Sequence, residues 1–235
     1  MLTETLQPVH PPASEQELLT RAGSLAGRTL RQIAGVLGIP VPLRLLNAKG
    51  WTGMLMEGYL GAGAGSLPEP DFAEFGIELK TLPVGKDGRP QESTYICTVP
   101  LVPVPGAGWE NSLVKRKLSR ILWIPVEADA AIPVADRRIG SALLWSPDRE
   151  QEKILRRDWE ELMEKVMLGN LDQISARHGK YLQIRPKARD SRSLRTGTDA
   201  EGRLVQTLPR GFYLRVSFTR QILSAQHVGK GSRGQ

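Results

Sequence analysis

The segment 77–83 constrains the fold most, because its apolar and polar residues alternate as in a β-strand. Successive side chains of a strand point to opposite faces, so Glu78 and Lys80 are expected to share one face. Asp71 precedes this strand, and a turn at residues 75–76 would bring it toward Glu78. The sequence therefore predicts two carboxylates and one ammonium group at the beginning of a single strand.

This set of side chains suits the hydrolysis of a phosphodiester bond. Asp71 and Glu78 offer the hard oxygen ligands that Mg²⁺ prefers, and the ion completes its shell with water and phosphate oxygens. Lys80 can orient or deprotonate an attacking water and offset negative charge. The same spacing is also common on exposed strands, where Glu78 and Lys80 would form only a solvated ion pair. The pattern alone leaves both interpretations open.

The rest of the chain predicts an α/β protein. A capping-box spacing at Ser14–Glu17 begins one helix, and a second helix begins near Thr29. Two interpretations of these helices are open: both pack their apolar faces on a core, or together they form a helix-turn-helix. The further expected elements are a helix at 51–60, strands at 94–102, 118–126, 141–145, 181–185 and 212–218, a long helix after 146–148, and a basic loop at 187–207. The strands at 77–83 and 94–102 are expected to form a hairpin, and 229–235 a disordered tail.

Charge is distributed unevenly over the 235 residues. The chain has 32 Lys and Arg against 25 Asp and Glu, and residues 177–235 hold 13 of the basic but only 3 of the acidic side chains. A strongly basic segment is either a solvated surface or a surface that neutralises phosphates. The composition is that of a globular protein, and the length fits one domain or two tightly joined lobes.

Several other chemistries are disfavoured. The single cysteine, Cys97, excludes an internal disulfide and a Cys-x-x-Cys site, and it is typical of a reducing compartment, so we expect a cytoplasmic protein. The three histidines are too scattered for a zinc site. The glycine-rich run at 61–66 lacks the ending of a phosphate-binding P-loop. No stretch predicts a secretion signal or a membrane span.

Blocks of residues along most of the chain resemble one family. The chain is similar to the MutH family, the strand-nicking endonucleases of methyl-directed DNA mismatch repair, within the restriction-endonuclease-like PD-(D/E)xK superfamily. The blocks that carry the resemblance are Lys49–Trp51, Glu57 with the glycine-rich run, Pro70–Ala73, Gly76–Thr81, Leu122–Glu127, Leu144–Pro147, Ala176–Gly179, Tyr181–Ala188 and Thr207–Tyr213.

The resemblance implies a fold, an activity and partners. The fold would be a single endonuclease domain over 1–235, in which a mixed sheet is flanked by helices and two lobes form a cleft for duplex DNA. The activity would be Mg²⁺-dependent nicking of the unmethylated strand at hemimethylated GATC sites, with unmethylated GATC as a further substrate. MutL would activate the enzyme after MutS has detected a mismatch.

The resemblance also implies roles for individual residues. The catalytic set would be Asp71 and Glu78 as metal ligands, Lys80 beside them, Glu57 on the preceding helix, and Lys117. The residues expected to contact DNA are Lys49, Glu92, Arg185, Pro186, Lys187 and Tyr213. For Lys117 a solvated basic face remains an alternative, and for Tyr213 a buried aromatic side chain. Lysine can donate hydrogen bonds to guanine in the major groove, and Tyr213 is the candidate for sensing a methyl group on adenine.

Two other functions remain open at this point. A restriction enzyme of the same fold would cut both strands without a partner protein. A non-catalytic DNA-binding module, suggested by the two short N-terminal helices, would bind DNA without a metal ion. The complete acid, acid and lysine set argues against the second of these.

Overall fold

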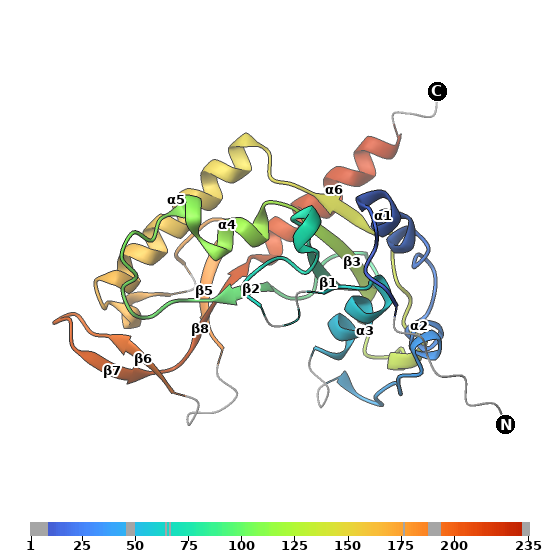
Figure 1. The fold of residues 1–235 in the computed structure, drawn as a ribbon, viewed down its shortest axis with the longest axis horizontal. Coiled ribbons are helices and arrows are strands. Elements are labelled where there is room, and N and C mark those ends of the chain that lie inside the picture. The colour runs from blue at the N-terminus through green and yellow to red at the C-terminus, as the bar shows by residue number, and fades with distance from the viewer. Residues whose placement is uncertain are drawn as a thin grey trace. The chain divides into compact units, whose positions relative to one another are not determined.

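A computed structural model describes residues 9–45, 50–63, 65, 67–175, 177–187 and 194–231. The chain is an α/β protein of helices and small β-sheets (Figure 1). It divides into two compact units. The first unit contains Met1–Gln91 and Ser119–Trp145, and the second contains Glu92–Leu118 and Ser146–Gln235. Within the described residues, no helix is both long and apolar enough to span a bilayer.

The first unit is built on the three-stranded sheet β1-β3-β4. Strand β1 (Glu78–Val84) pairs in parallel with β3 (Ile121–Glu127), and β4 (Leu143–Trp145) pairs with β3 in the antiparallel direction. The chain leaves the first unit after β1 and returns to it at β3. This excursion provides the long crossover connection that two neighbouring parallel strands need. The expected hairpin between 77–83 and 94–102 is therefore wrong, because the second of these segments belongs to the other unit.

Three helices share a buried core with this sheet, namely α1 (Glu15–Gly23), α2 (Leu30–Leu37) and α3 (Trp51–Leu60). Helix α3 contacts β1, and α1 and α2 contact α3. The Ser14 side chain caps α1, as the spacing predicted, and Thr29 forms a capping box with Gln32 at the start of α2. The apolar faces of α1 and α2 lie in the buried core, so packing on the core, rather than a helix-turn-helix, accounts for both helices.

The second unit is built on the antiparallel sheet β2-β8-β5, formed by β2 (Thr94–Thr98), β8 (Arg210–Leu214) and β5 (Leu182–Pro186). The long helix α5 (Arg149–Met167) packs against β5. Its N-cap is Asp148, which lies within the predicted start at 146–148, and one face of the helix is buried. The helix α4 (Leu113–Leu118) lies against β2 in the same unit.

The C-terminal part of the chain departs from two expectations. The expected basic loop contains a hairpin of β6 (Arg195–Thr198) and β7 (Leu204–Thr207), whose turn is closed by backbone hydrogen bonds to the Asp199 side chain. The expected strand at 212–218 ends with β8, and α6 (Val216–Gly231) follows. Residues 229–231 of the expected tail are helical, and 232–235 lie outside the described residues.

Short 3₁₀ helices complete both units. The first unit contains η2 (Ala73–Phe75) and η4 (Val134–Asp136), and the second contains η3 (Trp109–Asn111) and η5 (Leu171–Gln173). The first unit has 11 basic and 12 acidic residues, whereas the second has 21 basic and 13 acidic residues. The excess positive charge of the chain is therefore concentrated in the second unit.

Candidate active site and nucleic-acid interface

A tight turn connects Asp71 to the beginning of β1 in the first unit. The backbones of Phe72 and Ile77 exchange two hydrogen bonds, of 2.9 and 3.2 Å, across this turn. Gly76 has a φ of 62°, a conformation that suits glycine. The Asp71 carboxylate accepts a 2.8 Å hydrogen bond from the backbone N–H of Leu79. The chain thus turns back at residues 75–76, as the sequence predicted, and brings Asp71 to the strand that carries Glu78.

Glu78 and Lys80 lie together on β1. The Glu78 carboxylate accepts a hydrogen bond from the Lys80 ammonium group. The Glu78 side chain is only 1% exposed and that of Lys80 is 17% exposed. A pair with so little access to water is not the solvated ion pair that the spacing alone left open. Burial of a carboxylate and an ammonium group is costly unless they are paired, so this arrangement points to a chemical role.

The donor set fits a hard divalent cation. Asp71 and Glu78 are both buried, and one Asp71 oxygen is held by the Leu79 amide. Among the described residues, no three His, Cys, Asp or Glu side chains gather into a group that could hold a metal ion. Mg²⁺ needs only one or two carboxylates when water and substrate phosphate oxygens complete its shell. Two carboxylates beside a lysine therefore match Mg²⁺ better than a metal enclosed entirely by protein.

Glu57 lies on α3, which packs against β1. Its side chain is half-buried, and its Oε1 atom lies near Gly53, one turn earlier on the same helix. Glu57 does not form a three-carboxylate group with Asp71 and Glu78. A cavity of about 250 Å³ opens beside Asp71, and its lining includes Pro11, Gly61, Phe72, Glu74 and Phe75.

A second cluster of predicted site residues lies on the sheet of the second unit. Tyr213 on β8 stands opposite Tyr95 on β2, and their rings meet edge to face with centroids 5.4 Å apart. The Lys187 ammonium group donates a 2.6 Å hydrogen bond to the Tyr95 hydroxyl and lies 3.9 Å from the centre of that ring. The Arg185 guanidinium lies 5.7 Å from the centre of the Tyr213 ring. Two cations are thus held over two aromatic rings on one sheet face.

The surroundings of this cluster match a surface that contacts a ligand. Arg185, Pro186 and Lys187 are exposed, and Tyr213 is half-buried, so the alternative of a fully buried aromatic side chain is wrong. Burial raises the pKa of the Tyr213 hydroxyl, Tyr95 and Glu92 act in the same direction, and the Arg185 guanidinium opposes them. Tyr213 therefore stays protonated at neutral pH and can donate a hydrogen bond.

Two residues of this cluster were not predicted from the sequence. The sequence places Tyr95 in an expected strand but indicates no role for it. In the structure its hydroxyl also forms a 3.0 Å hydrogen bond with the Thr98 hydroxyl. Gly211 leaves the space that the two rings occupy, since a Cβ atom there would lie 2.8 Å from Tyr95 and 3.0 Å from Tyr213. The Gly-Phe-Tyr order at 211–213 was the available signal, because an alternating strand places glycine and tyrosine on one face.

The remaining predicted residues are placed as follows. Glu92 is exposed, and its neighbour Ser93 accepts a 2.7 Å hydrogen bond from Arg185. Lys117 is half-buried on α4, next to Lys115, whose ammonium group pairs with Glu110 and Glu152. These lysines belong to the second unit, whereas Asp71 and Glu78 belong to the first. Lys49 lies outside the described residues.

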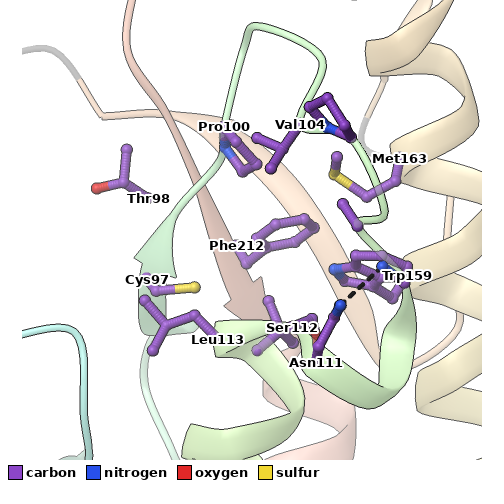
Figure 2. Close-up of a pocket in the computed structure, with 14 residues that line it drawn as sticks. Cys97, Thr98, Pro100, Val104, Asn111, Ser112, Leu113, Trp159, Met163 and Phe212 are labelled. Atoms are coloured by element: carbon purple, nitrogen blue, oxygen red, sulfur yellow. Dashed lines mark hydrogen bonds between the residues drawn. The ribbon is translucent and has the colours of Figure 1, made fainter.

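An apolar cavity of about 280 Å³ lies in the second unit. Figure 2 shows Phe212 in the middle of the residues that line it, with Trp159 and Met163 of α5 to one side. Phe212 and Tyr213 are adjacent on β8, so this cavity lies on the opposite face of the strand from the tyrosine cluster. Cys97 lines the cavity and is buried, as expected for a small apolar side chain. Apart from the Cys97 thiol, the lining contains no acidic, basic, histidine or tyrosine side chain.

Comparisons with known proteins identify one group of relatives. The family model described as "DNA mismatch repair enzyme MutH" matches residues 60–158. A protein of Vibrio parahaemolyticus named DNA mismatch repair protein MutH is 52% identical over 92% of this chain and 96% of its own length. Proteins of the same name from Vibrio campbellii (51% identical, 94% of this chain, 98% of the relative) and Klebsiella pneumoniae (52%, 91% and 93%) are similarly close.

Proposed function

Because this chain belongs to the MutH family and is therefore a DNA mismatch repair endonuclease, we propose that it nicks the unmethylated strand at hemimethylated GATC sites with Mg²⁺ as its cofactor. The observation that carries the catalytic part is the turn that brings the buried Asp71 carboxylate to β1, where Glu78 and Lys80 form a buried pair. Unmethylated GATC duplexes are a further proposed substrate.

Asp71 and Glu78 would hold the metal ion. When bound there, Mg²⁺ would lower the pKa of a coordinated water and stabilise negative charge on the scissile phosphate. The Leu79 amide orients the Asp71 carboxylate by a hydrogen bond to one of its oxygens. Lys80 carries a positive charge beside Glu78, where it can orient the attacking water and offset charge on the phosphate. Glu57 and Lys117 are proposed to assist from α3 and α4.

The tyrosine cluster of the second unit is proposed to read the recognition sequence. Lys187 would donate to guanine in the major groove, while Arg185, Pro186 and Glu92 border the same surface. Tyr213 would approach the adenine amino group, so that an added methyl group displaces a hydrogen bond or collides with the ring. Lys49 is proposed to contact the DNA backbone. This unit has 21 basic and only 13 acidic residues, and the surplus of positive charge supports binding of DNA phosphates.

The two compact units are proposed to be the two lobes of a restriction-endonuclease-like fold that receive duplex DNA between them. Family membership supports MutL as the activating partner, with MutS acting indirectly through MutL. A cytoplasmic location is also proposed, and the single, buried cysteine at position 97 supports it.

A nicking assay tests this proposal. Supercoiled plasmid with hemimethylated GATC sites is incubated with the protein, Mg²⁺ and MutL, and we expect nicked circles cut on the unmethylated strand. Fully methylated plasmid should stay intact. Absence of nicking with all components present would refute the proposal, and linear products formed without MutL would instead identify a restriction enzyme of the same fold.

A further inference from the structure

Arg120 lies immediately before β3, next to the proposed metal ligands. Its backbone carbonyl accepts a 3.0 Å hydrogen bond from the N–H of Glu78, so the main chain at Arg120 defines where β1 begins. Its guanidinium donates a 3.2 Å hydrogen bond to the carbonyl of Phe75. Phe75 belongs to η2, in the turn between Asp71 and Glu78. One residue therefore holds this turn at two points, through its backbone and through its side chain.

Glu15 on α1 orients this guanidinium. Its two carboxylate oxygens accept hydrogen bonds of 2.7 and 3.0 Å from the two terminal nitrogens of Arg120. The hydrogen bond from Arg120 lowers the pKa of the Glu15 carboxyl, so both partners are charged at neutral pH. Arginine alone among the basic side chains provides a planar fork that can engage a carboxylate with two nitrogens and still reach a third acceptor.

The exposure of the Arg120–Glu15 pair indicates that its main effect is on the position of the turn rather than on the stability of the fold. The Arg120 and Glu15 side chains are 34% and 38% exposed, and ion pairs with such access to water contribute little to stability. The contact to Phe75, in contrast, acts on the turn that sets the separation of the Asp71 and Glu78 carboxylates. We propose that Arg120, oriented by Glu15, is a positioning residue that holds this turn in the conformation that binds the divalent cation. This inference rests on the proposed metal site.

Metal binding in the absence of DNA tests the inference. Mn²⁺ binding to the full chain is followed by electron paramagnetic resonance for the wild type and for Arg120→Gln. We expect the dissociation constant to rise about tenfold, the lower end of the effect of losing an outer contact to a metal site. Amide hydrogen exchange at Leu79, whose N–H is bonded to Asp71, should become faster in the variant. Unchanged affinity together with unchanged exchange would overturn the inference.

A matched control and a conservative variant sharpen the test. Arg31 forms an ion pair of 2.9 Å with Asp136 in the same unit and is more exposed, at 65%, so Arg31→Gln should bind Mn²⁺ like the wild type. Arg120→Lys keeps the charge but lacks the fork and should remain impaired. Wild-type affinity in Arg120→Lys would refute the requirement for the fork.

A double-mutant cycle tests the role of Glu15. Glu15→Gln should weaken Mn²⁺ binding in the wild-type background and add nothing in the Arg120→Gln background, because it acts through Arg120. Additive effects would overturn this dependence. If the wild type binds no Mn²⁺, or if Asp71→Asn binds it normally, the proposed metal site itself fails. If Asp71→Asn abolishes binding while Arg120→Gln does not alter it, only the present inference fails.

Discussion

Gly211 provides a quantitative test of the tyrosine cluster. A Cβ atom at this position would lie 2.8 Å from a ring carbon of Tyr95 and 3.0 Å from one of Tyr213, whereas ordinary contacts begin at 3.4 Å. Gly211 belongs to the central strand β8, which pairs on both sides, so its backbone has little freedom to withdraw. In Gly211→Ala the two rings must instead move by roughly half an ångström, an overpacking that costs about 1–3 kcal/mol.

This displacement has a predicted functional size. A misplacement of about 1 Å can reduce a rate by roughly 100-fold, so half of that displacement corresponds to about tenfold. We therefore expect Gly211→Ala to lower the preference for unmethylated over methylated GATC by about tenfold. The assay compares initial nicking rates on oligonucleotide duplexes that differ only in adenine methylation, and thermal unfolding is recorded in parallel.

Gly35→Ala is the matched control. Gly35 lies within α2 of the other unit, and a Cβ atom there would meet no atom within 4 Å. Replacement of glycine by alanine in a helix interior is expected to stabilise by about 0.5–1 kcal/mol and to leave discrimination unchanged. If Gly211→Ala is folded and destabilised but discriminates methylation like the wild type, the rings do not position the sensor and the reasoning is refuted.

Further predictions concern other parts of the two sites. Asp71→Asn should abolish nicking while DNA binding in a gel-shift assay persists, and the control Asp136→Asn should keep full activity. Nicking by Asp71→Asn would show that Asp71 is not a metal ligand. Lys187→Ala should lower the preference for GATC over a single-base variant by about 5- to 150-fold, the value of one good base contact of about 1–3 kcal/mol, and an unchanged rate ratio would contradict its role. The folded pKa of Glu15 lies below its ordinary value of 4.5, so its stabilising contribution is present above pH 4.5 and is lost as the pH falls through the folded pKa. Because the pair is exposed, the unfolding temperature of Glu15→Gln should lie only slightly below that of the wild type at pH 7, and this small difference should vanish in acid. A difference of the same size at pH 7 and at acidic pH would contradict this.

The features that were predictable from the sequence depend on neighbouring residues. The alternation at 77–83 was sufficient to place Glu78 and Lys80 on one face of a strand. Glycine at position 76 permitted the turn toward Asp71. The caps of α1 and α2 depend on side chains only three residues from the amides they satisfy. Local chemistry of this kind changes little with tertiary context.

The features that were not predictable depend on contacts between distant residues. Strand β1 could not be paired from the sequence, because its partner β3 begins only after the chain has passed through the second unit. Lys187 and Tyr95 are 92 positions apart, so no spacing rule connects them. The sequence does not predict the helix after β8, because Val216 and Phe218 are β-branched and aromatic residues that favour strands.

The same contrast explains why the sequence does not single out Arg120. Its partner Glu15 is 105 residues away, and in the sequence it is one more basic residue after Lys115–Lys117. A local pattern can identify the side chains that hold a metal ion, because those groups must have particular chemistry. It cannot identify the residues that hold the backbone of the ligands, because such residues and their partners are brought together by the fold from distant positions in the sequence. The separation of Asp71 and Glu78 is thus a property of the contacts among α1, η2 and β3 as much as of the motif itself.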